Sequence, residues 1–260
     1  FLTLLIIVII REVKKMSSST VSKRSYGVDV ASYQSASVNY TGAKFAFVKV
    51  TEGTEYVNPK AEAQIKSAKD HGLMVMGYFY ANHSASVSKA RAEAKNAVAK
   101  AKAFGIPKGS CLADDFEHGS GNNVNGSISG NTDAILAAMQ VIKEAGYKPM
   151  VYSGAYVLHN RVSSSRIVKS YGTCLWVASY KITGRQDYAD FNYFPSMDGV
   201  AIWQFTDNYR GLGVDGNISL IDLKINSGNQ SPKSTNKTVE SLSQHPVVKW
   251  NIGAVAVVSN

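Results

Sequence analysis

The feature that most constrains the fold is a series of apolar segments, eight in all, separated by polar connections. The segments are nearly continuous in hydrophobic residues and do not alternate, which is typical of strands buried on both faces of a parallel sheet. They cover residues 28–33, 43–50, 73–80, 110–117, 148–156, 173–181, 199–206 and 219–225.

Three of the connections have the composition of helices, and they cover residues 60–71, 84–104 and 130–146. Pro59 precedes the first and Gly72 follows it, as expected at the two ends of a helix. The second is rich in alanine and lysine. The third has Thr132 or Asp133 near its start and Gly146 after its end.

Strands that alternate with helices predict a mainly parallel α/β fold. The number of segments favours an irregular (β/α) barrel of about eight mainly parallel strands, with fewer helices in the second half because the later connections are poorer in helical sequence. A flat doubly wound sheet is the alternative. No strand is followed by a glycine-rich nucleotide-binding loop, and no G-x-S-x-G motif indicates a serine nucleophile.

The composition of the 260 residues fits one large domain with appendages. We expect a main domain at 26–226, an N-terminal extension at 1–25, and a polar linker with a short tail at 227–260, which is a candidate truncated binding segment. The apolar run FLTLLIIVII at the start is too short to span a membrane and lacks the charge order of a signal peptide. Cys111 and Cys174 are too few for a disulfide scaffold and are expected to be buried free thiols.

Basic residues exceed acidic ones, giving a formal net charge of +9. Residues 1–27 contribute +4 of this charge and residues 228–260 contribute +2. No basic stripe is interleaved with aromatic residues, so nucleic acid is not an expected partner. Anionic polymers such as acidic polysaccharides are compatible with the charge, through the basic tail among other segments.

The stretch SCLADDFEHG, from Ser110, places several carboxylates at the end of an apolar segment. Residues two apart in a strand share a face, so Asp115 and Glu117 point one way and Asp114 and Phe116 the other. Asp29 and Asp215 also lie near strand ends, and in a parallel barrel these ends form the active face. Paired carboxylates in different surroundings, one able to donate a proton, are how glycosidases work. Capping of the next loop is the alternative use of such acids.

Two other readings of the same region are open. His83 and His118 could join the aspartates around a metal ion, although no H-x-H or H-x-x-x-H spacing occurs. Aromatic residues near the strand ends could stack on sugar rings or fill the core. Core packing is favoured for Phe79, Trp176 and Phe205, and a cleft for Tyr56, Tyr152 and Tyr180; the others of this set are Tyr33, Tyr78, Tyr80 and Trp203.

Taken in order, several motifs resemble glycoside hydrolase family 25, the Chalaropsis-type lysozymes or N-acetylmuramidases. They are GVDVASYQ, FVKVTEGTEYVNP, GYFYA, LADDFE, AGYKPMVYSG, LWVASY, FPSMDGVAIWQFTD and GVDGNISLID, over about residues 26–225. The linker and tail, without a signal peptide, resemble a phage endolysin of a Gram-positive host.

The resemblance implies an irregular α/β barrel that cuts the β-1,4 bond between N-acetylmuramic acid and N-acetylglucosamine in peptidoglycan. Glu117 would be the general acid, and Asp115 would orient the acetamido group of the substrate as that group attacks the anomeric carbon, with net retention. Asp29 and Asp215 would tune this pair. The substrate-binding residues would be Gln34, Lys49, Glu52, Tyr56, Tyr80, Tyr152, Tyr180 and Gln204.

The same resemblance implies no cofactor, no metal, no stable membrane insertion and a monomer. We expect synthesis in the cytoplasm of the bacterial host with holin-type release to the wall, or secretion if residues 1–15 are a truncated targeting segment. A non-catalytic wall-polysaccharide-binding barrel and a metal-dependent polysaccharide deacetylase are the alternative functions.

Two positions depart from the family pattern. Tyr80 takes the place of a usual histidine, with His83 three residues later. Asp114 takes the place of a usual apolar residue. It would either face the helix layer as one member of a pair, or mark an alternative register in which it takes over part of the role of Asp115.

Overall fold

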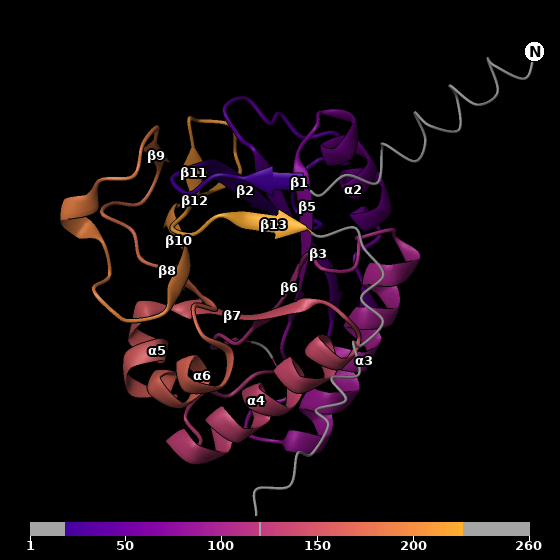
Figure 1. The fold of residues 1–260 in the computed structure, drawn as a ribbon, viewed down its shortest axis with the longest axis vertical. Coiled ribbons are helices and arrows are strands. Elements are labelled where there is room, and N and C mark those ends of the chain that lie inside the picture. The colour runs from indigo at the N-terminus through magenta and orange to yellow at the C-terminus, as the bar shows by residue number, and fades with distance from the viewer. Residues whose placement is uncertain (1–18, 120, 226–260) are drawn as a thin grey trace, which may run out of the picture. The chain divides into compact units, whose positions relative to one another are not determined.

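The computed structural model describes residues 19–119 and 121–225, and within these ranges eight strands close into a barrel (Figure 1). The strands are β2 (Tyr26–Val30), β3 (Phe45–Glu52), β5 (Met74–Tyr80), β6 (Cys111–Asp115), β7 (Lys148–Gly154), β8 (Leu175–Ala178), β10 (Val200–Thr206) and β12 (Asp215–Ser219). Their order is β2-β12-β10-β8-β7-β6-β5-β3, and pairing of β2 with β3 closes the ring. The barrel prediction is therefore confirmed, and the flat sheet is wrong.

One strand runs against the others. β12 pairs antiparallel with both β10 and β2, whereas the remaining neighbours in the ring pair in parallel. The first residue of β12 therefore lies at the same rim as the last residues of the parallel strands. This reversal makes the barrel irregular, and it brings Asp215 opposite Asp29.

The strand predicted at 219–225 is wrong as the last strand of the barrel. Only Ser219 of this range belongs to β12, and the chain then leaves the barrel to form β13 (Leu223–Ile225), which pairs with β1 (Ser19–Val21). The apolar pattern missed β12 because Asp215 and Asn217 face buried polar partners instead of an apolar core. Residues 19–25, assigned above to an extension, thus include a paired strand, while 1–18 and 226–260 lie outside the described residues.

The helices are α2 (Ala61–Asp70), α3 (Val87–Ala103), α4 (Ile128–Glu144), α5 (Ala155–Asn160) and α6 (Ser164–Tyr171). The start predicted for the third helix is wrong, because the Ser127 hydroxyl caps it by accepting a hydrogen bond from the Gly130 N–H at 3.0 Å. Thr132 instead donates to the Ile128 carbonyl within the first turn. The short helices α5 and α6 were not predicted, since each has fewer than nine residues, which is too short for a helical pattern to be recognised in the sequence.

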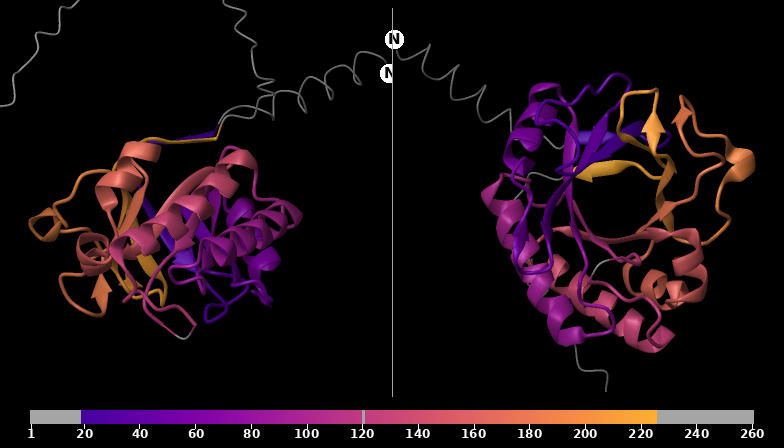
Figure 2. Two further views of the ribbon diagram at one scale, coloured as in Figure 1. Left: turned by 90° about the horizontal axis from the view of Figure 1, so that it is seen from below. Right: turned by 180° about the vertical axis from the view of Figure 1, so that it is seen from behind.

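Two kinds of packing cover the barrel. On the β3–β7 side, α3 and α4 lie side by side on the strands, with small buried residues such as Ala94 and Ala138 between them (Figure 2). Beside β10, β12 and β2, an aromatic cluster replaces helices in the part of the chain that the structure describes. It contains Tyr26, Trp203, Phe205 and Tyr209, and it extends to the 3-10 helix η1 (Phe191–Tyr193).

Several smaller predictions can be checked in the same structure. Cys111 and Cys174 are buried and unpaired, as expected. Phe79 and Phe205 are fully buried core residues. Among the residues described here, no helix is both long enough and apolar enough to span a bilayer. The two-residue strands β4 (Tyr56–Val57), β9 (Arg185–Gln186) and β11 (Asn208–Tyr209) lie in loops at the rim.

Candidate active site

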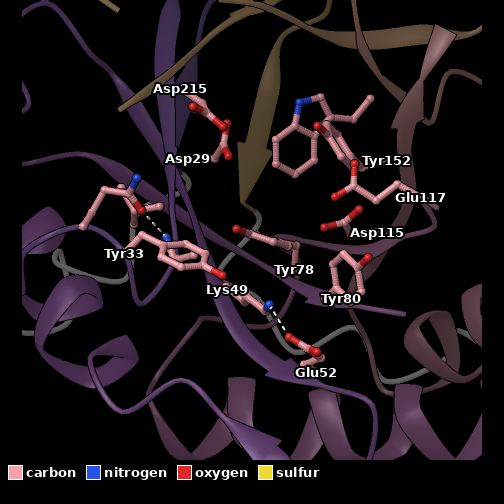
Figure 3. A pocket seen from close by; sticks show the side chains of 14 residues that line it. Asp29, Tyr33, Lys49, Glu52, Tyr78, Tyr80, Asp115, Glu117, Tyr152 and Asp215 are labelled. Carbon is pink, nitrogen blue, oxygen red and sulfur yellow. Dashed lines mark hydrogen bonds and ion pairs between the residues drawn. The ribbon is translucent and has the colours of Figure 1, made fainter. Parts of the chain in front are cut away.

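The rim that carries the C-terminal ends of the parallel strands surrounds a cavity of about 380 Å³ (Figure 3). Its walls bring together acidic, aromatic and amide side chains from β2, β3, β5, β6, β7, β8 and β12. The lining residues are Asp29, Val30, Ala31, Tyr33, Gln34, Lys49, Glu52, Tyr78, Tyr80, Asp115, Glu117, Tyr152, Trp176 and Asp215. All four acids singled out from the sequence therefore line one cavity.

Asp29 and Asp215 form a carboxyl pair at the junction of β2 and β12, where they are direct partners in the strand register. Burial raises the pKa of both groups, and the negative charge of Asp29 raises that of Asp215 further. Hydrogen bonds from Asn217 and Gln204 to Asp29, at 2.7 and 2.8 Å, favour its ionised form. The pKa of Asp215 is thus raised by the charge of its partner as well as by burial, so Asp215 is the member of the pair that more readily keeps a proton.

Asp115 ends β6 and Glu117 follows two residues later, on the same face of the chain. Asp115 is 4% exposed, and its Oδ1 atom has no hydrogen-bond partner among the residues that the structure describes. Burial and then the charge of Glu117 raise the pKa of Asp115 well above its ordinary value. Burial and the charge of Asp29 raise the pKa of Glu117, which is more accessible and points into the cavity.

Lys49 is the cation of the cavity. Its ammonium group pairs with Glu52 at 2.7 Å and lies 4.8 Å from the ring centre of Tyr80. Its charge lowers the pKa of both Asp115 and Glu117, but burial outweighs this effect. The site thus has fewer positive charges than carboxyl groups, a condition that favours keeping protons on some of them.

Tyrosine hydroxyls surround the acids. Burial, and then the nearby carboxylates, raise the pKa of Tyr78 and Tyr152 well above the usual value and that of Tyr80 to about 12. These hydroxyls therefore stay protonated and can donate hydrogen bonds at neutral pH. Trp176 was expected in the core and is 1% exposed, yet its ring also forms part of the cavity wall, between Phe47 and Tyr152.

The residues expected to bind substrate fall into two groups. Gln34, Lys49, Glu52, Tyr80 and Tyr152 line the cavity itself. The other three lie around it. Tyr56 lines an adjoining groove that shares Glu52 with the cavity, and the buried Gln204 lies behind the wall. Tyr180 is 38% exposed and donates a hydrogen bond to Gln204.

Gln204 is 1% exposed and connects the Asp29–Asp215 pair with two tyrosines. Its Nε2 donates to Asp29 and Asp215, and its Oε1 accepts from Tyr152 and Tyr180. It therefore cannot touch a ligand in this arrangement. Its contacts instead orient groups that do.

Sequence reasoning missed Asn217. Its amide donates to Asp29 at 2.7 Å and accepts from the Trp176 indole N–H at 2.7 Å. It therefore holds an acid and an aromatic wall residue in place. The only signal available was its position two residues after Asp215, on the same face of the strand.

His83, considered above as an alternative metal ligand beside the aspartates, lies in the loop between β5 and α3 and does not line the cavity. Its side chain is fully buried and pairs with Asp114 at 3.2 Å, away from the cavity lining. Asp114 and Phe116 thus face the helix layer, and the paired alternative for Asp114 is the observed one. His118 is exposed, and in the ranges 19–119 and 121–225 no three histidine, cysteine or acidic side chains are grouped so as to hold a metal ion.

The geometry indicates proton transfer by carboxyl groups beside an aromatic, sugar-sized cavity. Four carboxyl groups with raised pKa values converge there, and two of them lie on one face of one chain segment. Such a set can protonate a leaving oxygen while a neighbouring carboxylate stabilises positive charge.

Comparison with known sequences agrees with this chemistry. Residues 28–214 match the family described as glycosyl hydrolases family 25. A lysozyme of Lactococcus phage mv1 is 42% identical over 179 residues, which cover 68% of this chain and 89% of the relative. A lysozyme of Streptococcus phage Cp-7 is 32% identical over 206 residues, covering 78% of this chain but only 55% of the relative.

Solved structures show the same fold. The modular Cpl-1 endolysin, solved with a peptidoglycan analogue, has 30% identity and a TM-score of 0.66, covering 78% of this chain and 56% of that one. A muramidase from Trichobolus zukalii has 28% identity and a TM-score of 0.58, covering 75% and 92%. The chain thus spans about half the length of the modular relatives, and its similarity to them lies in the barrel.

Proposed function

Because the chain belongs to glycosyl hydrolases family 25, we propose that it hydrolyses the β-1,4 bond between N-acetylmuramic acid and N-acetylglucosamine in bacterial peptidoglycan. The observation that carries this proposal is the convergence of Asp29, Asp115, Glu117 and Asp215 on one cavity. The printed description of the Cpl-1 complex, with a peptidoglycan analogue, supports the class of substrate.

In the proposed mechanism Glu117 gives its proton to the glycosidic oxygen as the bond from that oxygen to C1 of the muramic residue breaks. The carbonyl oxygen of the 2-acetamido group forms a new bond to C1, giving an oxazolinium ion. Asp115 accepts a hydrogen bond from the acetamido N–H and stabilises the positive charge. Water then attacks C1 as the bond from C1 to the acetamido oxygen breaks and the acetamido group is restored. Glu117 takes the water proton, and the product retains its configuration.

Which of Asp115 and Glu117 carries the proton depends on whether substrate is bound. In the free protein Asp115 is the more deeply buried member of the pair, and its pKa is raised further than that of Glu117. An acetamido N–H against Asp115 favours the ionised form of that group, as does the developing positive charge. Substrate binding therefore moves the shared proton toward Glu117, the group that faces the cavity.

Asp29 and Asp215 act on the pair from across the cavity. The ionised Asp29 raises the pKa of Glu117 and so keeps the acid protonated. Asp215 carries the proton that makes a charge on Asp29 tolerable beside the other acids. The tyrosines and Lys49 bind sugar hydroxyl and carbonyl groups.

The test of the acid is Glu117→Gln, which keeps the shape of the side chain and removes the proton. We expect a fall in kcat of about 10²- to 10⁴-fold on solubilised peptidoglycan, the usual contribution of general acid catalysis, with unchanged thermal stability. Turnover near that of the wild type would contradict the assignment of Glu117. Asp115→Asn is expected to lose activity in the same assay and to remain folded.

The two alternative functions give other results in this assay. A wall-binding barrel would bind peptidoglycan and release no sugar fragments from it. A metal-dependent deacetylase would lose activity with a chelator, whereas the proposed hydrolase keeps its activity. We further propose that the protein acts as a phage endolysin on the host wall, on the basis of the phage lysozymes to which it is similar.

A further inference from the structure

The backbone of Glu117 lies beyond the regular part of the barrel. Strand β6 ends at Asp115, and the next ladder bond runs from the Phe116 N–H to the Tyr152 carbonyl at 2.9 Å. Beyond this bond, side chains donate the hydrogen bonds that backbone groups of a neighbouring strand would otherwise supply. The Ser153 hydroxyl donates to the Phe116 carbonyl at 2.6 Å, and the Asn122 amide donates to the Glu117 carbonyl at 2.8 Å.

Asn122 is a bridge between two segments that are far apart in the sequence. It is 2% exposed, and its Oδ1 accepts a hydrogen bond from the Ser84 N–H at 2.8 Å while its Nδ2 donates to Glu117. The Ser84 hydroxyl in turn accepts from the Asn123 N–H at 2.9 Å. The loop after Glu117 is thereby tied to the connection between β5 and α3.

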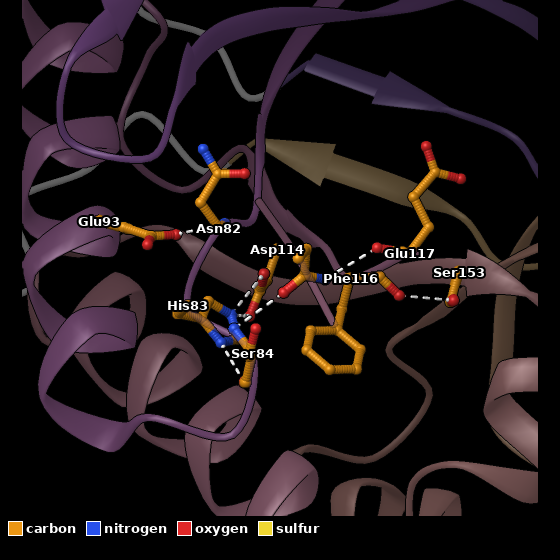
Figure 4. Close-up of polar contacts among 9 residues, drawn as sticks. Asn82, His83, Ser84, Glu93, Asp114, Phe116, Glu117 and Ser153 are labelled. Carbon is orange, nitrogen blue, oxygen red and sulfur yellow. Dashed lines mark hydrogen bonds and ion pairs between the residues drawn. The ribbon is translucent and has the colours of Figure 1, made fainter. Parts of the chain in front are cut away.

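The connection between β5 and α3 is itself held in place by the buried side chain of His83. Ser84 has a φ of 49°, a left-handed conformation that costs free energy for a residue other than glycine. The ring nitrogen Nδ1 of His83 bonds the Ser84 carbonyl at 2.8 Å, and Nε2 bonds Asp114 at 3.2 Å (Figure 4). The His83 ring also stacks on Phe116, with ring centres 5.3 Å apart.

The His83–Asp114 pair is built to persist at neutral pH. Burial lowers the pKa of His83, but the charge of Asp114 and its hydrogen bond outweigh this, so that the pKa is raised. Both partners are completely buried, so breaking the pair would leave an unpaired polar group in the protein interior. Asp114 takes the place of a usual apolar residue, so its presence needs a reason beyond packing.

On the basis of the proposed function, we propose that Asn122 is a positioning residue for Glu117, and that the buried His83–Asp114 pair fixes the segment to which Asn122 is bound. Asn122 does not line the cavity and so does not contact substrate. It sets where the Glu117 backbone, and hence the acid, lies relative to the leaving oxygen. A displacement of about 1 Å at such a group can cost on the order of 10²-fold in rate.

The first test is Asn122→Ala, with Asn125→Ala as the matched control. Asn125 is an exposed asparagine in the same loop, and its side chain makes none of these contacts. We expect Asn122→Ala to lower kcat by about 10- to 100-fold while KM changes less than about twofold. Asn125→Ala should match the wild type. If Asn122→Ala does not fold, Asn122→Asp keeps the shape and the Ser84 bond but cannot donate to Glu117, and it should show the same loss.

A second test separates positioning from general support of the fold. In a Glu117→Gln background there is no acid to position, so Asn122→Ala should lower kcat by less than about threefold further. An equal loss in both backgrounds, or a wild-type kcat for Asn122→Ala, would overturn the inference. Asp114→Asn should lower kcat by about 3- to 10-fold, and the loss should not add to that of Asn122→Ala, because both act through one path.

These outcomes distinguish the two proposals. A wild-type protein with no turnover would refute the proposed function. An active wild type whose Glu117→Gln variant is equally active would refute the choice of acid. An active wild type that depends on Glu117 and not on Asn122 would refute the positioning inference alone.

Discussion

Asp115 is the residue at which stability and chemistry conflict most clearly. A carboxyl group that is 4% exposed, with one oxygen atom unpartnered, loses hydration on folding that the protein does not replace. The raised pKa of Asp115 reflects the same loss of hydration, because burial disfavours the charged form. In the proposed mechanism the reaction uses this group, whereas a neutral isostere should make the fold more stable.

We therefore predict that Asp115→Asn is more stable than the wild type at neutral pH, because the neutral amide removes the buried charge whose desolvation raises the pKa of Asp115. Below the unfolded-state value of 3.8 the wild-type group is protonated in both states, so the gain is absent there. As pH rises above that value, the unfolded state loses its proton first, and the gain grows until the folded pKa is passed. Urea unfolding at several pH values measures this.

The control for this prediction is Asp133→Asn, because Asp133 is a half-exposed acid on α4 in a surface ion pair with Arg166. Its stability should change by less than about 0.5 kcal/mol at any pH. A gain for Asp115→Asn that is equal at pH 3 and pH 7, or a loss at pH 7, would show that Asp115 is not a buried, destabilising acid.

Residue-level reasoning from the sequence found the four acids but not their support. Asp29, Asp115, Glu117 and Asp215 were identifiable because acids at strand ends stand out against apolar segments. Asn217 and Asn122 were not, since a polar residue in a loop or a short strand shows nothing of the partner that it meets in the fold. The partner of Asp114 was equally hidden, because His83 lies 31 residues away.

At the scale of elements, local signals succeeded where they are physically strong. Helices α2, α3 and α4 were predicted because 10 or 17 residues of good propensity between caps leave few alternatives. β12 was misplaced because its direction and its polar interior face come from pairing across the barrel. The end of β6 was misjudged by two residues for a related reason: side chains extend the ladder beyond the strand.

The cap of α4 offers a prediction at this scale. Ser127→Ala removes the acceptor of the Gly130 N–H and should lower the free energy of unfolding by about 1 kcal/mol, with kcat unchanged. Ser129→Ala, at an exposed position in the first turn of the same helix, should have an effect below about 0.5 kcal/mol. Equal stability of Ser127→Ala and the wild type, in urea unfolding, would contradict the assignment of the cap.

At the scale of the whole molecule, closure of the barrel is what makes the site. Pairing of β2 with β12 joins positions 29 and 215, which are almost at opposite ends of the described chain. The same closure places β6 across from them, so that the charge of Asp29 reaches Glu117. The site is therefore a property of the closed ring, and no segment of the chain contains it alone.

The measurement that tests this account most directly is mass spectrometry of the soluble fragments released from purified peptidoglycan, with and without borohydride reduction. The wild type should release fragments with muramic acid at the reducing end, and Glu117→Gln should release about 10²- to 10⁴-fold less in the same time. Fragments with glucosamine at the reducing end would contradict the bond assigned here. Wall binding with no release of sugar fragments by the wild type would contradict hydrolysis itself.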